Sequence, residues 1–274
     1  DQPRPGETVS AIIDFVLEES RRHQLPSIHW LFPTPDELEP LLDRGFLHRI
    51  GCQFHWQNRG YRDFQDYLDT FTAKPRKNIN RERRRVREAG LELRLLHGGE
   101  IGEAQWQAVH AFYRSTFQRL GGIPTLTLPF FLEIANTLGE RLVLVLASLR
   151  GREVAAAISF RDDTTLYGRH WGCRADYDSL HFEACYYQGL EYCIERGLRR
   201  FEPGAQGEHK IQRGFLPTLT HSAHWIAHPG FRRAIADFLA RETPAVREYA
   251  RELLQHSPYR DEVTLDAPAV AGPA

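Results

Sequence analysis

The sequence contains no methionine and only four cysteines in 274 residues. A chain of this size without methionine, the initiator included, is unusual, and we expect either a fragment of a longer protein or a sequence written without modified methionines. The cysteines lie in apolar stretches and form no Cys-x-x-Cys pair. This spacing favours reduced, buried thiols in a cytoplasmic protein over disulfides or a zinc site.

Long apolar runs and an excess of charge of either sign are also missing. No apolar run approaches the roughly eighteen residues that span a bilayer, and the amino terminus lacks the pattern of a secretory signal. We therefore expect no membrane span and a cytoplasmic location. The 35 basic and 36 acidic residues give a formal net charge of −1, so a surface for nucleic acid has to be a local one.

Hydrophobic periodicity predicts an α/β protein. The amino-terminal part has the pattern of a helix, a strand, a helix and an extended stretch, at 9–23, 27–32, 35–45 and 46–56. Helical spacing follows at 61–71 and 74–87, and the pattern restarts after Gly90 as strand, two helices, three strands, helix, strand, loop and strand. We expect these elements at 91–96, 101–118, 129–138, 141–149, 154–161, 165–174, 182–196, 198–203, 204–217 and 218–227, before one or two closing helices at 231–255.

Three stretches of the sequence carry a resemblance to a known family. They are the basic tract from Lys74 to Arg87, closed by Gly90 and a strand; GCQFHWQNRGYRDF before it; and HFEACYYQGLEYCIERGLRRFEPGAQGEHKIQRGFLP after it. Together they are similar to the FemAB-like family of N-acyltransferases, also described as peptidoglycan biosynthesis or recognition proteins. The resemblance spans about residues 27–258, and the element order from Leu91 onward resembles the fold of GCN5-related N-acyltransferases (GNAT).

The resemblance implies an α/β (α+β) fold of the GNAT type, in a tandem arrangement whose first lobe is incomplete. We expect four segments on this basis. They are the carboxyl-terminal half of a first GNAT-like lobe at 1–60, linking helices with the basic tract at 61–90, a second GNAT-like lobe at 91–258, and a tail at 259–274.

The charged loop after the strand at 198–203 is the first candidate site. Acyl transfer to an amine needs a group that takes the amine proton, and we expect this base among Glu202, Glu208 and His209. Taken alone, such a polar stretch is typical of a solvated surface turn. The preceding strand and the family resemblance favour the functional interpretation.

The same loop has the groups that hold an anion. Lys210 and Arg213 are candidates for phosphate or carboxylate contacts, and Gly204 and Gly207 let backbone N–H groups approach an anion closely. No Gly-Lys-Ser or Gly-Lys-Thr occurs, so the loop is not a Walker A motif and nucleotide hydrolysis is disfavoured.

Further candidates lie on the predicted helix at 182–196 and the strand before it. His181, Glu183 and Tyr187 fall near the start of this helix or off its apolar stripe, where free N–H groups can bind an anion. On the strand, alternation puts Arg169 and Trp171 on one face; Trp171 suits a core position and Arg169 a binding position.

The basic tract holds the candidates for contact with phosphates, and in relatives that use aminoacyl-tRNA the RNA backbone is the natural anion. Ile79 and Val86 give it only a narrow apolar seam, so the alternative is a solvated helix. Nothing in the sequence suggests a module that reads bases. The candidates are Lys74, Arg76, Lys77, Arg81 and Arg84.

A metal site is not expected. His221, His224 and His228 lie close together in the sequence, but on a strand His221 and His224 point to opposite faces.

The resemblance and these residues predict an acyltransferase that passes an acyl or aminoacyl group from an activated donor directly to an amine. No Ser-His-Asp or Cys-His order suggests a covalent enzyme intermediate. We expect no permanently bound cofactor, with acyl-CoA or aminoacyl-tRNA as co-substrate, a small-molecule or peptide amine as acceptor, and tRNA as a candidate partner. The alternative is a non-catalytic module that binds cell-wall fragments or RNA through the same cleft and basic helix.

Overall fold

The structure, a computed structural model, describes residues 5–205, 207–261 and 263–265. The chain forms two compact units that alternate along the sequence. Unit 1 consists of the residues up to 53 together with 217–255, and unit 2 consists of 54–216 together with the residues from 256 on. The assignment of segments to GNAT-like lobes stays a prediction, and residues 266–274 of the predicted tail lie outside the described part.

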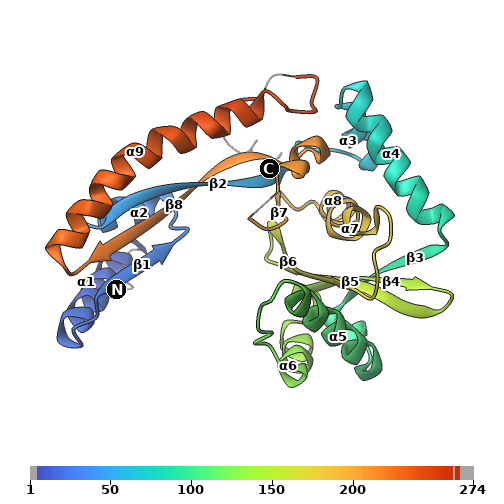
Figure 1. The fold of residues 1–274 in the computed structure, drawn as a ribbon, viewed down its shortest axis with the longest axis horizontal. Helices are drawn as coiled ribbons and strands as arrows, with labels where there is room; N and C mark the ends of the chain where they lie inside the picture. The colour runs from blue at the N-terminus through green and yellow to red at the C-terminus, as the bar shows by residue number, and fades with distance from the viewer. Residues whose placement is uncertain (1–4, 206, 262, 266–274) are drawn as a thin grey trace. The chain divides into compact units, whose positions relative to one another are not determined.

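Unit 1 has a small sheet with helices on both of its faces (Figure 1). Alternation puts Trp30 and Ala223, which are register partners, on the face covered by α1 and α2, where Ile13 is fully buried. On the other face His224 and Ile235 of α9 line a cavity of about 260 Å³. The elements are α1 (Pro5–Arg22), β1 (Ser27–Leu31), α2 (Pro35–Asp43), β2 (Leu47–Gln57), β8 (Leu216–Ile226) and α9 (Pro229–Leu254).

Unit 2 is built on a mixed sheet in the order β7-β6-β5-β4-β3, and the last residues of β2 pair with β7. The pair β6 and β7 is parallel, and β3 to β6 pair antiparallel with their neighbours. The strands are β3 (Leu91–His97), β4 (Leu142–Leu149), β5 (Arg152–Arg161), β6 (Thr165–Cys173) and β7 (Arg200–Glu202). The helical elements are α3 (Phe64–Asp69), α4 (Ala73–Glu88), η1 (Gly98–Glu100), α5 (Glu103–Arg119), α6 (Leu128–Leu138), η2 (Gly139–Arg141), α7 (Leu180–Phe182), η3 (Glu183–Tyr187), α8 (Gln188–Glu195) and η4 (Glu208–Arg213).

Alternation on β4 divides the core of unit 2 between the two faces of its sheet. Leu144 packs into the cluster formed with α5 and α6, whereas Val145 packs with Ala184 of η3 on the opposite face. Figure 1 shows α5 and α6 on one side of strands β3 to β6 and α7 and α8 on the other. Gly172 allows α5 to approach the sheet, because a Cβ there would lie 2.1 Å from the Phe112 carbonyl oxygen.

The structure differs from the sequence-based expectation in two places that shape the site. The stretch at 204–217 is not a loop throughout, since Glu208–Arg213 forms the 3₁₀-helix η4, and Gly214 in a left-handed conformation (φ 81°) ends it. The predicted helix at 182–196 begins at Leu180 and contains the five-residue π-helix η3. A π-helix inserts an extra residue into a helical turn, and such insertions are frequent at functional sites.

The cysteines and the histidine cluster make no ligand set in the described part of the chain. All four cysteines are free thiols. His224 Nδ1 lies 2.8 Å from His29 Nδ1, and His221 Nδ1 lies 2.9 Å from His48 Nε2. Among the residues described, no group of three or more His, Cys, Asp and Glu side chains could hold a metal ion.

Candidate active site

The site lies where β7 ends and the chain turns into η4. Gly204 (φ 99°) and Gly207 (φ 110°) have backbone conformations that residues with a side chain rarely adopt, so these two glycines make the turn possible. In a 3₁₀-helix residues three apart share a face, which places Lys210 and Arg213 on the same inward side. Gly214 then closes the helix with a φ of 81°, and a Cβ at this position would lie 2.1 Å from the Tyr67 hydroxyl and 2.7 Å from the Tyr259 hydroxyl.

Lys210 is a buried cation without a carboxylate partner. Only 2% of the residue is exposed, and its Nζ donates a hydrogen bond to the Gly204 carbonyl oxygen at 2.7 Å. Among the described residues no Asp or Glu oxygen lies within 4.0 Å of this ammonium. Burial lowers the pKa of Lys210 from 10.5 to about 8. Because lysine is almost never buried without an ion-pair partner in a structural role, this side chain marks a candidate functional site.

His209 lies next to this lysine on the exposed side of η4. Its Nε2 is 2.9 Å from the Tyr186 hydroxyl, and its ring packs against Phe182. Partial burial, followed by the charges of Arg213 and Lys210, lowers the pKa of His209 below 6.5. The imidazole is therefore neutral at pH 7 and able to accept a proton.

His181 completes the aromatic lining of this cluster. Its ring centroid lies 5.4 Å from that of Tyr186 and 6.4 Å from that of His209. Burial, and then the charges of His209, Arg213 and Lys210, lower the pKa of His181 to about 4. A neutral His181 adds a polar edge to the cluster without adding positive charge.

Arg213 connects η4 to two other elements. Its Nη2 donates to Glu82 Oε1 of α4 at 2.8 Å, and its Nη1 donates to the His209 carbonyl oxygen at 2.8 Å. The guanidinium lies 3.5 Å from the centroid of the Phe182 ring. The other carboxylate oxygen of Glu82 accepts a hydrogen bond from the Tyr187 hydroxyl. Arg213 and Tyr187, which the sequence predicted as binding residues, are thus brought together by a carboxylate from α4.

Glu183 has a different environment from the one expected at an open helix start. It is 4% exposed and its carboxylate is bound by Arg83, with Oε1 to Nη2 at 3.1 Å. The same guanidinium binds Glu191 at 2.8 Å, and Phe64 stacks on it at 4.6 Å. Glu183 is therefore part of the contact between α4 and η3, and Glu191 extends that contact to α8.

The other predicted residues of the site lie apart from this cluster or at its surface. Glu202 is on the face of β7 opposite Phe201, the residue that packs on α8, and it pairs with Arg200 at 3.0 Å. Burial raises the pKa of Glu202. Glu208 is exposed, and Arg169 is exposed where the register of β5 and β6 shifts. The structure therefore groups Lys210, His209, Arg213, His181 and Tyr187, and it groups neither Glu202 nor Arg169 with them.

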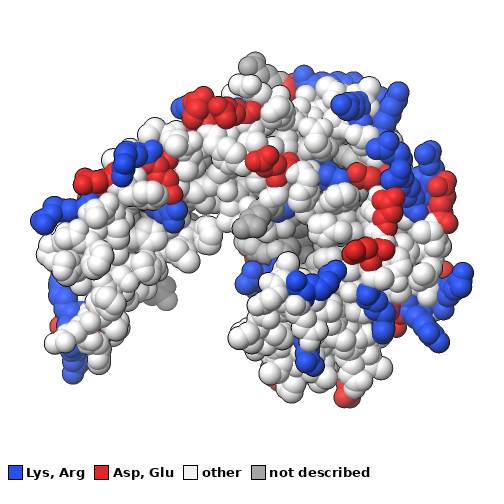
Figure 2. Space-filling view, in the orientation of Figure 1, with Lys and Arg blue, Asp and Glu red and all other residues white. Residues whose placement is uncertain are grey.

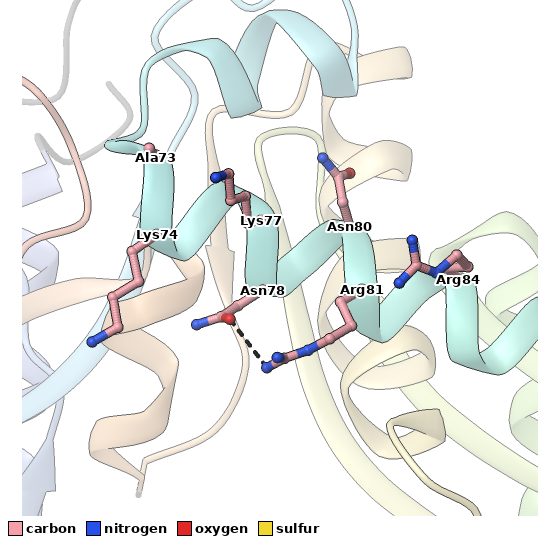
Figure 3. A pocket seen from close by; sticks show the side chains of 7 residues that line it. All are labelled: Ala73, Lys74, Lys77, Asn78, Asn80, Arg81 and Arg84. Carbon is pink, nitrogen blue, oxygen red and sulfur yellow. Dashed lines mark hydrogen bonds between the residues drawn. The ribbon is translucent and has the colours of Figure 1, made fainter.

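The outer face of α4 carries a shallow groove of about 660 Å³. Figure 2 shows Lys and Arg side chains gathered over α4, and Figure 3 shows the Lys and Arg side chains that line the groove. Arg76 is not one of them, since it pairs with Asp69 at 3.3 Å. The groove is lined by Ala73, Lys74, Lys77, Asn78, Asn80, Arg81 and Arg84.

Four residues that contact the site were not predicted from the sequence: Glu82, Arg83, Phe182 and Tyr186. A signal for the first two is present, because they lie three and four residues after Ile79, on the same helical face as that buried residue. Charged residues on the apolar seam of a helix need partners inside the protein.

The sequence profile of the FemAB-like family, described as peptidoglycan biosynthesis/recognition, matches residues 2–261. The chain belongs to the FemAB-like family. No curated protein sequence matches the chain significantly.

Solved structures with a similar fold include the C-terminal domain of a protein described as a lysylphosphatidylglycerol synthetase, L-PGS and FemX. The C-terminal domain of a protein described as such a synthetase from Agrobacterium fabrum aligns with a TM-score of 0.59 and 12% identity, covering 87% of this chain and 78% of that one. L-PGS from Bacillus licheniformis gives 0.59 and 11%, covering 84% and 78%. FemX gives 0.58 and 12%, covering 85% and 80%. At these identities the similarity shows the fold, and it confirms the predicted α/β fold of the GNAT type for this FemAB-like protein.

Within the described residues of this FemAB-like chain, none of the helices combines the length and the apolar character that crossing a membrane requires.

Proposed function

We propose that the protein is an N-acyltransferase that moves an aminoacyl group from aminoacyl-tRNA to an amine acceptor. The observation that carries the proposal is Lys210, a buried ammonium with a carbonyl oxygen beside it and, among the residues that the structure describes, no carboxylate. Membership of the FemAB-like family and the fold shared with FemX and the lysylphosphatidylglycerol synthetases support the same reaction class.

The cluster contains a group for each step of the transfer. The acceptor amine attacks the ester carbonyl of the donor, a C–N bond forms, and the ester C–O bond breaks. Lys210 stabilises the oxyanion that develops on the carbonyl oxygen, using N–H groups that Gly204 does not occupy. His209 takes the proton that the amine loses and returns it to the leaving ribose hydroxyl. For this role Nε2 donates to the Tyr186 oxygen, which leaves Nδ1 as the proton acceptor.

The outer face of α4 supports aminoacyl-tRNA as the donor. This helix has 16 residues, a length of about 24 Å. Its groove presents cations at intervals over most of that length, which suits an extended phosphate backbone better than a single pyrophosphate. Acyl-CoA is the alternative donor, and it requires no contact with this face.

A transfer assay tests the proposal. The protein is incubated with bulk tRNA carrying radiolabelled amino acids and with peptide or lipid amines, and label in the acceptor is counted. We expect transfer that depends on acceptor and falls by about 10²-fold or more in Lys210→Ala. Thermal stabilisation by acetyl-CoA without any binding of tRNA would contradict the proposed donor. Binding of ligands without turnover, unchanged in Lys210→Ala, would favour the non-catalytic module instead.

RNA binding to α4 can be tested separately. Replacing Lys77 and Arg81 together by Glu reverses two charges in the groove. We expect the affinity for tRNA to fall at least tenfold at low salt, and the slope of log K against log salt to become shallower by about 2. Arg87→Glu is the control for each of the single variants Lys77→Glu and Arg81→Glu, because Arg87 is exposed on the same helix and does not line the groove. An equal loss in the control would refute binding in the groove.

A further inference from the structure

Two side chains of α4 point inward, in contrast to the cations of its outer face. The side chains of Glu82 and Arg83 are only 15% and 16% exposed, and both bind residues of the helical segment 180–195. Arg83 holds Glu183 and Glu191. Glu82 is next to Arg81 of the groove in sequence, so α4 displays cations on one side and supplies a carboxylate on the other.

The carboxylate of Glu82 holds two elements of the active site at once. Oε1 accepts from Arg213 of η4 at 2.8 Å, and Oε2 accepts from the hydroxyl of Tyr187 in η3. Both partners are buried. Since a carboxylate with two oxygens on two elements fixes their separation, a shift of α4 moves or releases both.

The contacts continue from Glu82 to the base. Arg213 donates to the His209 carbonyl oxygen at 2.8 Å, and His209 in turn contacts Tyr186, the neighbour of Tyr187. Among the described residues, the charges that lower the pKa of His209 are those of Arg213 and Lys210, both positive, and its ring also faces the titratable side chains of His181 and Tyr186. Glu82 compensates the first of them, because its ion pair with Arg213 is the one formed by that guanidinium among the described residues.

We propose that Glu82 is a positioning residue that couples occupation of the cationic face of α4 by RNA to the geometry of His209 and η4. The inference rests on the proposed function for its ligand, and it adds a regulated step to it. RNA bound along the groove adjusts α4, and the Glu82 carboxylate transmits that adjustment through Arg213 to the base.

The first test needs no ligand. The pKa of His209 is measured by ¹³C–¹H NMR of the histidine ring, with the resonance assigned by its absence in His209→Gln. In Glu82→Gln the charge of Arg213 is no longer compensated, so we expect the pKa of His209 to fall by roughly 0.5. Glu88→Gln is the matched control: it makes the same charge change on α4, but Glu88 is exposed and its ion pair among the described residues is the one with Arg84 at 3.7 Å. The control should leave the pKa of His209 unchanged.

The second test follows the effect of RNA. Hydrogen exchange is measured with and without an uncharged RNA acceptor-stem minihelix. We expect the RNA to slow exchange in α4, in η4 and in η3 of the wild type. In Glu82→Gln the RNA should bind within twofold of the wild-type affinity and protect α4 alone. If Glu82→Gln does not fold, Tyr187→Phe replaces it, because it removes one partner of Glu82 and keeps the ion pair of Glu82 with Arg213, and RNA should then fail to protect η3.

The outcomes separate this inference from the proposed function. Equal His209 pKa values in Glu82→Gln and Glu88→Gln overturn the positioning role, whether or not RNA binds. Protection of α4 without protection of η4 in the wild type overturns the coupling, while the proposed donor stands. If the minihelix does not bind the wild type, the tRNA donor and the coupling both fail, and the NMR titration alone decides the positioning role.

Discussion

Lys210→Met should make the protein more stable and inactive at the same time. The pKa of Lys210 lies at about 8 instead of 10.5, a difference that corresponds to roughly 3 kcal/mol of destabilisation of the folded, charged lysine. Methionine fills a similar volume without the charge. The substitution also removes the hydrogen bond to the Gly204 carbonyl oxygen, worth about 1 kcal/mol, and Gly204 is exposed, so water can replace the donor. The net gain is about 2 kcal/mol, or about 4–8 °C in Tm.

The lowered pKa of Lys210 also predicts how the stability difference between Lys210→Met and the wild type changes with pH. Below about pH 8 Lys210 is protonated in both folded and unfolded chains, so the full penalty applies to the wild type. Between about 8 and 10.5 the unfolded chain binds a proton that the folded chain does not, and the stability of the wild type therefore rises with pH. The advantage of Lys210→Met should be complete at pH 7 and nearly absent at about pH 10.

Denaturant unfolding, followed by tryptophan fluorescence and fitted with separate transitions for the two units, measures this advantage for unit 2. The other titrating groups are common to both proteins and cancel in the difference. Two results would refute the conclusion that the buried charge of Lys210 destabilises the fold. One is a Lys210→Met protein that is less stable than the wild type at pH 7, and the other is a stability difference that does not change with pH. Activity in the transfer assay should be lost in the same variant.

Two further predictions concern the base and the glycine that closes η4. His209→Gln should lower transfer about 10²-fold and remove the acidic limb of the rate profile, which in the wild type lies below pH 6.5 because His209 must be neutral; an acidic limb that persists in the variant would assign the proton to another group. Gly214→Ala should reduce the free energy of unfolding by about 3 kcal/mol or more, since the added Cβ would lie 2.1 Å from the Tyr67 hydroxyl oxygen at a φ of 81°. Gly151→Ala, at a φ of 74° with nothing within 4 Å, isolates the conformational cost of about 1 kcal/mol, and an equal loss in both variants would contradict the packing argument.

The element order was predictable because its signals are local. The helix expected at 101–118 is α5, Glu103–Arg119, which begins after Gly102 and ends where Gly121 adopts a left-handed conformation. The strand expected at 165–174 is Thr165–Cys173. The π-helix η3 was not predictable, since its extra residue is stabilised by contacts with α4 and η4 that are distant in sequence.

The site was predictable in its residue types and only partly in its arrangement. Lys210 and Arg213 stand out in the sequence as charges after a strand, but their burial follows from the 3₁₀ geometry of η4, which periodicity does not reveal. Glu82 is separated from Arg213 by 131 residues, so nothing local links them. Only its position on the seam of Ile79 and Val86 indicated that it faces inward.

The alternation of the two units along the chain sets an order in which they can be completed during synthesis. Nearly all of unit 2 lies in the continuous stretch 54–216, whereas unit 1 needs both its first 53 residues and the stretch 217–255. On the ribosome, the strands and helices that carry the Lys210 cluster emerge while α1 and β1 still lack β8, the strand with which β1 pairs. A nascent chain stalled before β8 therefore exposes the apolar faces of α1 and β1. We expect a chaperone that binds this nascent chain to bind these faces.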